Sequence, residues 1–405
     1  MLEPAHPADL PLIESTVQRL RLDAERLDVE QFVVWRDQGR VLAFGRIKPY
    51  DDGVFELAGV AVLEEARGRG LGKLITRALI DRFPARDVWI TTDLVEFFEP
   101  LGFRRSDVGP AAISAKLERV CASLRTGVVA MVLHKVGVDL VDAFTRAAGE
   151  GNRAGVVVDA TGLDAAAMQR LARAVAASET AFVAPHLRLR YFTPAAEVPF
   201  CGHATLATVH RLGELGRLAP GRHVVRCEAG DVDVELEADG RVWLTPPQPP
   251  WRESPIPEKE IFRLLGGDPT MRDRELPILA AGWKLFVPLC RRADLFALAP
   301  RWEELAATGF GAFAFTRDAI EPGSVAHARF FAPAVGVRED PVTGAAHGPL
   351  AAYLAQRGVL AVPARARAEQ GDAMGKPGRV DYDVTAERAR IGGYAVTVLT
   401  GEARA

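Results

Sequence analysis

Two segments of the chain repeat nearly the same pattern, and this duplication constrains the fold more than any other feature of the sequence. The first copy reads R-Y-F-T-P-A at residues 190–195 and C-G-H-A-T at residues 201–205. The second copy reads R-F-F-A-P-A at residues 329–334 and D-P-V-T-G-A at residues 340–345. Each copy passes from an aromatic strand through a proline turn into a helix. The repetition therefore predicts two related lobes.

The two predicted helices are bounded by glycines. They begin near Gly202 and Gly344, each 14 residues before a second glycine, Gly216 or Gly358, which stands where a C-terminal cap is expected. If the lobes face each other, two helix N-termini meet at one cleft, where unpaired N–H groups and positive dipole ends favour a carboxylate. The alternative is a duplicated fold that keeps no site.

Further motifs accompany the repeat: V-D-A-F-T at 141–145, G-N-R-A-G-V-V-V at 151–158, S-E-T-A-F-V at 178–183, E-D-P-V-T-G-A-A-H at 339–347 and E-Q-G at 369–371. With the repeat, they resemble the phenazine-biosynthesis PhzF-like family, relatives of diaminopimelate epimerase. The resemblance implies an α/β (α+β) domain of two pseudo-symmetric lobes, each a sheet rolled partly around a helix. It also implies an isomerase or epimerase that moves a proton on or off carbon in a small carboxylate-bearing molecule, without a cofactor.

Glu179 is the candidate base for this proton transfer. Abstraction of a proton from carbon needs a base held close, little water and stabilisation of the charge that develops. Glu179 lies between Ser178 and an apolar run, so partial burial is expected to raise its pKa toward the working range. The resemblance gives this glutamate the acid/base role, since the S-E-T-x-F context is kept. A carboxylate that caps or bridges a helix end is the alternative.

His203 and Asp340 are the candidate polar partners, one from each copy of the repeat. His203 lies at a helix start, where the dipole disfavours the imidazolium and a neutral ring is suited to hydrogen-bond substrate. Asp340 holds the corresponding place in the second copy, and we expect it to face His203 across the cleft and to position substrate or relay a proton. A buried structural histidine and a plain helix cap are the alternatives. The expected substrate-binding residues are Ser178, Cys201, Gly202, Thr343 and Gly344.

Two positions bear on this assignment. Many relatives have serine where this chain has Ala345, so a hydroxyl that would touch substrate is missing. Cys201 aligns with a position where racemase relatives use a thiol base, an alternative to Glu179 as the base.

Composition indicates a soluble globular protein of two or three domains, with 405 residues, 48% of them apolar and 25% charged. A net charge of −3 argues against a nucleic-acid partner. No apolar run reaches the length of a membrane span and the polar start lacks a signal peptide's core, so a cytoplasmic protein is expected. The four cysteines have neither metal-site nor disulfide spacing, so no metal is expected. A homodimer is one state that the sequence allows.

A separate first domain is predicted for residues 1–135, ahead of the PhzF-like domain at residues 136–405. Helical periodicity covers residues 7–20, and strands are expected at 31–35, 41–48, 54–63 and 128–135, with helices at 74–82 and near 116–124. No Pro/Ser-rich linker separates the domains, so a short ordered connection is expected.

The glycine-rich run A-R-G-R-G-L-G-K at residues 66–73 follows a strand and leads into a helix. Glycines let the backbone approach a diphosphate, and the helix dipole adds favourable charge. Because the run contains R-x-x-G-x-G, it resembles the pyrophosphate loop of the GNAT acetyltransferases. The resemblance implies acetyl-CoA as co-substrate, held by Val60, Val62, Arg67, Gly68, Arg69, Gly70, Leu71, Gly72 and Lys73.

Acetyl transfer by this domain depends on two residues. Glu56, on the strand before the loop, is the candidate that takes a proton from an incoming amine through a water; an ordinary strand-face carboxylate is the alternative. Relatives often have a tyrosine that protonates the departing thiolate where this chain has Phe98, which lacks a proton to give.

The sequence therefore predicts a bifunctional enzyme, an acetyl-CoA-dependent N-acetyltransferase for a small amine or amino acid joined to a cofactor-independent isomerase that uses Glu179. One alternative makes the first domain an acyl-CoA-binding regulatory domain, which Phe98 favours. A second makes the PhzF-like domain a dehydratase or a binding module without turnover, which Ala345 keeps open.

Overall fold

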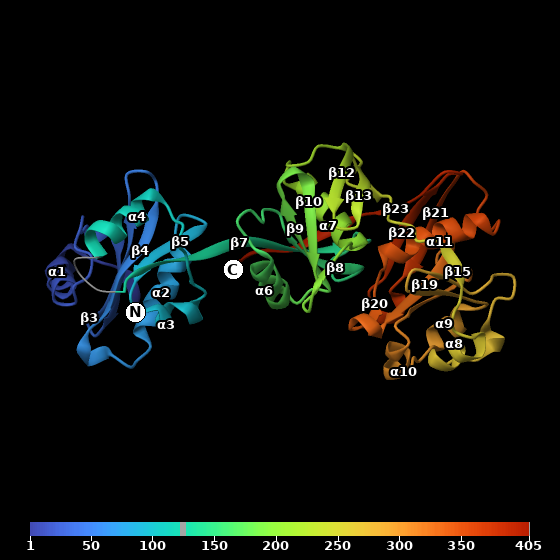
Figure 1. Ribbon diagram of the computed structural model, residues 1–405, viewed down its shortest axis with the longest axis horizontal. Helices are drawn as coiled ribbons and strands as arrows, with labels where there is room; N and C mark the ends of the chain where they lie inside the picture. Colours follow the sequence, from blue (N-terminus) through green and yellow to red (C-terminus); the bar gives the residue numbers. More distant parts are fainter. Residues whose placement is uncertain (122–126, 405) are drawn as a thin grey trace. The chain divides into compact units, whose positions relative to one another are not determined.

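The computed structural model describes residues 1–121 and 127–404, which divide into two compact units (Figure 1). The first unit is Met1–Val136 with the last residues of the chain, and the second is Gly137–Glu402. Strand β7 (Val129–Ala143) includes the division point. The domain boundary that the sequence places between residues 135 and 136 stays a prediction. Within the described ranges, no helix has the length and apolar character needed to cross a membrane.

The first unit is built on a mixed sheet with the strand order β1-β2-β3-β4-β5-β7-β6. Neighbouring strands are antiparallel apart from β4 and β5, which run parallel through Glu56 opposite Trp89. Beyond this pair, residues 57–62 and 90–92 line one cavity, so the two strands diverge there. The strands are β1 (Leu2–Pro4), β2 (Phe32–Asp37), β3 (Arg40–Pro49), β4 (Phe55–Val62), β5 (Asp87–Thr92) and β6 (Arg104–Arg105).

Four α-helices accompany this sheet in the described residues: α1 (Leu10–Arg19), α2 (Leu71–Arg82), α3 (Val95–Phe98) and α4 (Ala111–Lys116). Helix α2 buries Ile75 and Leu79 against strands β3 and β4, as its apolar periodicity predicts. The helix expected near residues 116–124 begins five residues earlier, at Ala111, because Pro110 stands directly before the first turn. A π-helical turn, Leu117–Cys121, continues it, and residues 122–124 of that prediction lie outside the described residues.

In the second unit, the strands of the first lobe follow the order β7-β8-β9-β10-β12-β13-β14, and β11 also pairs with β10. The pairs β8–β9 and β10–β12 are parallel and the others antiparallel. The strands are β8 (Asn152–Val157), β9 (Glu179–Ala184), β10 (Arg188–Phe192), β11 (Glu197–Val198), β12 (Gly221–Cys227), β13 (Gly230–Leu236) and β14 (Val242–Leu244).

The second lobe repeats this topology as β16-β17-β18-β19-β21-β22-β23, with β20 also paired to β19. The pairs β17–β18 and β19–β21 are parallel, at the positions equivalent to those of the first lobe. The predicted doubling into two related lobes is therefore confirmed. The strands are β15 (Trp251–Glu253), β16 (Leu279–Ala281), β17 (Lys284–Leu289), β18 (Gly311–Thr316), β19 (Ser324–Ala332), β20 (Val337–Asp340), β21 (Ala364–Gln370), β22 (Gly378–Val384), β23 (Ala389–Gly393) and β24 (Ala395–Arg404).

Each lobe holds one largely buried helix, α7 (Gly202–Glu214) or α11 (Gly344–Gln356). Both begin at the glycines predicted from the sequence. Gly216 and Gly358, just beyond their ends, have φ angles of 65° and 71°, the left-handed conformation that makes glycine the favoured residue of a C-terminal cap. The remaining helices are α6 (Ala165–Val175), α8 (Glu258–Leu264), α9 (Arg292–Ala297) and α10 (Trp302–Ala307).

Candidate active sites

The starts of α7 and α11 lie against each other in the second unit. A Cβ atom added to Gly202 would lie 3.2 Å from the backbone nitrogen of Ala345 and 3.4 Å from the Cα of Gly344. Only a residue without a side chain allows so close an approach without local movement. The convergence of two helix N-termini expected from the repeat is therefore present, and it brings residues from both lobes to one place.

Glu179, Cys201 and His203 form one compact group beside these helix starts. Glu179 begins β9, Cys201 precedes the first residue of α7, and His203 lies in its first turn. His203 Nε2 lies 3.4 Å from Glu179 Oε2, and His203 Nδ1 lies 3.4 Å from the Cys201 sulfur. Donor atoms of all three residues lie within 4.8 Å of one another, close enough to hold a metal ion as well as to exchange protons.

Asn152 links this group to Asp340 of the other lobe. Its amide nitrogen donates to Asp340 Oδ1 and to the Val342 carbonyl oxygen, at 2.8 Å in each case, and lies 3.3 Å from His203 Nδ1. An amide N–H₂ group has two hydrogens, and these two oxygens accept both, so the Asn152 side chain fixes the position of Asp340 against the start of α11 beside the His203 ring. Asn152 was not among the predicted site residues, although it lies in the G-N-R-A-G motif.

Asp340 is held on its other side by Thr343, whose hydroxyl donates to Asp340 Oδ2 at 2.6 Å. The backbone N–H of Thr343 donates to Gln370 Oε1 at 3.0 Å, and Gln370 Nε2 donates to the Asp340 carbonyl oxygen at 2.8 Å. Ser178 contacts the other face of the site, with its hydroxyl 3.2 Å from His203 Nε2. Gln370 is a second residue that the sequence analysis missed; the E-Q-G motif contains it.

Burial sets the protonation of the group. Burial raises the pKa of Glu179, against hydrogen bonds from Ser178 and Cys201, and burial raises the pKa of the Cys201 thiol well above its usual value. Burial also raises the pKa of Asp340, to about 6; attraction to His203 works against this shift and the charge of Glu179 adds to it. The pKa of His203 is lowered, mainly by burial. Near neutral pH, the group therefore holds a neutral thiol and a neutral imidazole.

Lys284 brings positive charge to the side of Asp340. It begins β17, and burial lowers its pKa to about 8, although attraction to Asp340 works against this shift. Among the described residues, no lysine or arginine forms a salt bridge with Glu179 or with Asp340. The two carboxyl groups are therefore not neutralised by a fixed cation.

The first unit contains a separate cavity of about 390 Å³ between the diverging strands β4 and β5. Val60, Val62, Arg67 and Gly72, four of the residues predicted to hold acetyl-CoA, line it. A neighbouring hollow is lined by most of the glycine-rich loop, residues 66–68 and 70–73. These two hollows bring the predicted loop and the predicted strand together.

The loop has the backbone that its glycines predict. Gly68 and Gly70 have φ angles of 77° and 76°, and Gly70 stands directly before the first residue of α2. Leu71 is buried and lines the hollow beside the loop, whereas Arg69 is exposed and its guanidinium lies 3.7 Å from the Asp37 carboxylate. Lys73 lines the hollow beside the loop. The helix start, the loop and these cations suit a diphosphate.

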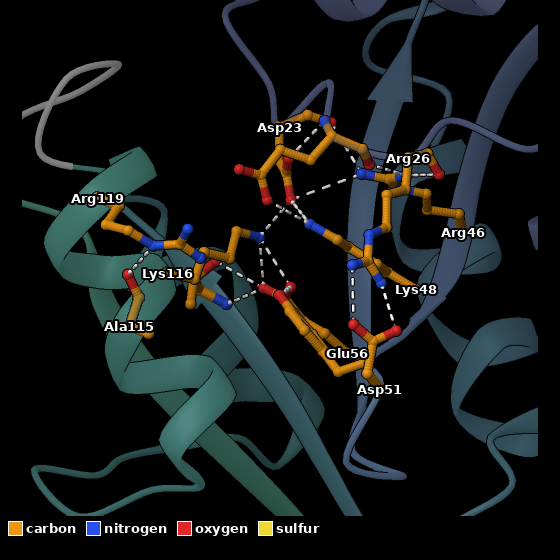
Figure 2. Close-up of polar contacts among 12 residues, drawn as sticks. Asp23, Arg26, Arg46, Lys48, Asp51, Glu56, Ala115, Lys116 and Arg119 are labelled. Carbon is orange, nitrogen blue, oxygen red and sulfur yellow. Dashed lines mark hydrogen bonds and ion pairs between the residues drawn. The ribbon is translucent and has the colours of Figure 1, made fainter.

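Glu56 is fully buried, and its carboxylate is surrounded by hydrogen-bond donors (Figure 2). Lys116 Nζ lies 2.8 Å from each of its oxygens. Tyr50 donates its hydroxyl to Oε2 at 2.7 Å, and Thr91 donates its hydroxyl to Oε1 at 2.6 Å. Glu56, the predicted proton acceptor, is therefore part of a buried network whose other members were not among the predicted site residues.

Asp23 and Lys48 extend this network. Asp23 Oδ2 lies 3.0 Å from Lys116 Nζ and 2.6 Å from Lys48 Nζ. Burial would raise the pKa of Asp23, but the attraction of Lys116 and the other contacts hold it at about 2. Burial would lower the pKa of Lys116, but attraction to Glu56 and Asp23 outweighs it and raises that pKa. Both groups are therefore charged at neutral pH.

Phe98, the residue found in place of a tyrosine, lines the cavity. Its ring packs edge-on against Phe97 at 4.9 Å and against Phe103 at 5.6 Å between centroids. This aromatic cluster supplies apolar surface and no acidic proton at that position.

Comparison with known proteins identifies both parts of the chain. Residues 141–401 match the family described as phenazine biosynthesis-like protein, and residues 3–103 match the acetyltransferase (GNAT) family. The chain belongs to the phenazine biosynthesis-like protein family and carries a GNAT domain ahead of the region that defines it. Both resemblances drawn from the sequence are thereby confirmed.

The relatives bear the names of isomerases. An uncharacterized isomerase of Deinococcus radiodurans is 37% identical over 286 residues, which cover 64% of this chain and 92% of the relative. The uncharacterized isomerase YddE of Escherichia coli is 35% identical over 292 residues, 65% of this chain and 96% of the relative. The crystal structure of a PhzF-family phenazine biosynthesis protein of Bacillus anthracis matches with a TM-score of 0.62 and 28% identity, over 66% of this chain and 99% of that one.

Proposed function

We propose that the second unit is an isomerase that transfers a proton at carbon in a small carboxylate-bearing molecule, with Glu179 as the base. One observation carries the proposal: the Glu179 carboxyl has a raised pKa and lies 3.4 Å from a neutral histidine, without a lysine or arginine salt bridge among the described residues. Such a carboxyl exchanges protons closer to neutral pH than an exposed one does.

In this proposal, Glu179 takes a proton from the carbon next to the substrate carboxylate and then returns it to carbon. The negative charge that develops on substrate is stabilised by the N–H groups at the starts of α7 and α11 and by a ring N–H of the neutral His203. Asp340, with a pKa of about 6, positions the substrate or relays a proton from the other lobe. Lys284 supplies positive charge on that side for a second anionic group.

The test is hydrogen exchange in deuterated water, followed by proton NMR on a panel of small amino, hydroxy and enol carboxylates. One carbon-bound hydrogen of a substrate should exchange in the presence of the native protein. Glu179→Gln keeps the shape of the side chain and removes the base, so exchange should fall by about 100-fold or more. Cys201→Ala is the matched control and should keep most of the rate.

Two results would redirect the assignment. If Cys201→Ala is inactive and Glu179→Gln still exchanges, the thiol is the base and the unit works as the racemases do. Loss of a hydroxyl group from the substrate, in place of exchange, would make the unit a dehydratase. We expect a chelator to leave the rate of hydrogen exchange unchanged. If a chelator abolishes exchange and added Zn²⁺ restores it, the group of Glu179, Cys201 and His203 binds a metal ion.

We further propose that the first unit binds acetyl-CoA through residues 67–72 and the cavity beside β4. The family match and the shared cavity of Arg67, Gly72 and Val60 support this. Calorimetry should detect acetyl-CoA binding to the native protein and none to Gly70→Asp, which sets a negative charge against the diphosphate. Gly70→Ala introduces the same backbone strain without the charge and is the matched control.

Transfer of the acetyl group to a small amine or amino acid is the finer hypothesis for this unit, with Glu56 as the residue that takes the proton. The contacts of Glu56 with Lys116 and the presence of Phe98 favour the alternative, an acyl-CoA-binding regulatory domain beside a catalytic isomerase. A screen of amines for acetylated product separates the two.

A further inference from the structure

Lys116 lines the cavity proposed for acetyl-CoA. The residue ends α4, and its side chain points toward Glu56 and Asp23 (Figure 2). Thr91 of β5 and residues 57–62 of β4 line the same cavity. The glycine-rich loop lies at the Val62 end of this strand, since Gly72 approaches the Val62 side chain. Lys116 binds Glu56, six residues earlier in β4, so the loop and the ammonium lie toward opposite ends of this strand.

The ammonium group is bound in a way that matches its chemistry. A primary ammonium has three N–H donors, and Lys116 Nζ has three carboxylate oxygens within reach: Glu56 Oε1 and Oε2 at 2.8 Å and Asp23 Oδ2 at 3.0 Å. Only 4% of the Lys116 side chain is exposed, and the side chain of Glu56 is fully buried. The planar fork of a guanidinium does not fit three oxygens arranged around one nitrogen.

Lys48, a second buried lysine that contacts Asp23, differs from Lys116 because it does not line the cavity. Lys48 also contacts Asp23, at 2.6 Å, and is equally buried, but its other carboxylate partner is Glu25 and it does not line the cavity. Lys116 alone of the two joins both buried carboxylates and reaches the space between β4 and β5.

We propose that Asp23 and Glu56 form a recognition site for a primary alkylammonium group, and that Lys116 is the built-in occupant of this site. The inference rests on the proposed acetyl-CoA cavity, because the bound amine would face the same space. While Lys116 holds the site, the unit binds acetyl-CoA without binding a free amine there, and an acceptor amine enters only when the Lys116 side chain withdraws.

The test replaces the occupant with a free ligand. Lys116→Ala removes the three methylene groups and the ammonium beyond Cβ, so propylammonium fills the space left behind. Calorimetry should show that the variant binds propylammonium at least about tenfold more tightly than the native protein does. Affinity should fall for methylammonium and for pentylammonium, and 1-propanol and guanidinium should not bind.

Lys48→Ala is the matched control, because it removes an equally buried lysine from Asp23 without opening the cavity; it should gain no propylammonium affinity. If Lys116→Ala does not fold alone, propylammonium should restore its melting transition in a saturable manner. The proposal would be overturned if Lys116→Ala and the native protein bind propylammonium with equal affinity, or if propylammonium rescues Lys48→Ala to the same degree. It would also be overturned if propylammonium neither binds nor refolds Lys116→Ala. Acetyl-CoA binding, measured separately with Gly70→Asp, reports on the proposed function of the cavity independently of these amines.

Discussion

Each unit of the chain encloses a pair of carboxyl groups, and the two pairs are held in opposite ways. In the first unit, Asp23 and Glu56 share the ammonium group of Lys116, and the pKa of Asp23 is held at about 2. In the second unit, the carboxyl groups of Glu179 and Asp340 lack such a cation among the described residues, and burial raises the pKa of Asp340 to about 6. The presence or absence of a fixed cation therefore gives carboxyl groups in the two units opposite pKa shifts.

The difference separates carboxylates suited to binding from carboxylates suited to proton transfer. A carboxylate fixed as an anion by a buried ammonium gives up its charge only at very low pH, so it holds a cation well and takes protons poorly. A carboxyl group whose pKa is raised toward neutrality takes and releases protons. This contrast supports the assignment of proton chemistry to the second unit and of binding to the first.

The largest effect that tests the comparison is on stability. Glu56→Gln leaves the buried Lys116 with Asp23 as its remaining carboxylate partner, so the first unit should lose about 3–5 kcal/mol of stability to denaturant. Among the described residues, Glu179 forms no salt bridge with a lysine or arginine. Glu179→Gln therefore leaves no buried cation without a partner and should leave the stability of the second unit nearly unchanged. Glu25→Gln is the control for the first unit, because the Glu25 side chain is 45% exposed and its pairing with Lys48 should contribute under about 1 kcal/mol. Equal losses in Glu56→Gln and Glu179→Gln would contradict the contrast.

The pH dependence of stability provides the next test. Because the pKa of Asp340 rises from 3.8 to about 6 on folding, the folded state binds its proton more tightly, and this residue's contribution to stability falls as pH rises from about 4 to about 6. Asp340→Asn lacks this titration, so its melting temperature relative to the native protein should increase over that window and level off above it. The exposed Glu228→Gln should show no such trend. If the difference in melting temperature between Asp340→Asn and the native protein shrinks as pH rises, folding lowers the pKa of Asp340 and does not raise it.

A smaller effect links the two carboxyl groups of the second unit. The charge of Glu179 contributes to the raised pKa of Asp340, so Glu179→Gln should lower the Asp340 pKa below about 6. Carbon-detected NMR titration of the aspartate carboxyl measures this, with Cys201→Ala as the control that keeps the Glu179 charge. An Asp340 pKa unchanged by Glu179→Gln would show that the two groups are not coupled.

The smallest effect is expected at the predicted domain boundary. Residues 130–140 lie in strand β7, so a protease at low dose should cut there no faster than elsewhere in the chain. Mass spectrometry of the fragments measures this. Rapid, clean cleavage into two stable pieces would show an exposed tether between the domains.

The sequence by itself determined the doubling, the two families and the positions of the main helices. The helices at Gly202 and Gly344 and their capping glycines followed from local rules, because a helix end depends on the residues next to it. The helix at Ala111 was placed wrongly by five residues, since its start depended on Pro110, which the prediction did not use. The candidates Glu179, His203 and Asp340 came from motif order, and their catalytic roles remain proposals.

Only the tertiary structure decided which charges meet. Lys116 and Glu56 are 60 residues apart, and Asn152 and Asp340 are 188 apart, so no local pattern in the sequence joins them. The same residue type, an aspartate, became an ion-paired anion at Asp23 and a carboxyl of raised pKa at Asp340. The physical reason is that a pKa depends on the depth of burial and on the charges within a few ångströms, and both are fixed only when distant segments pack together.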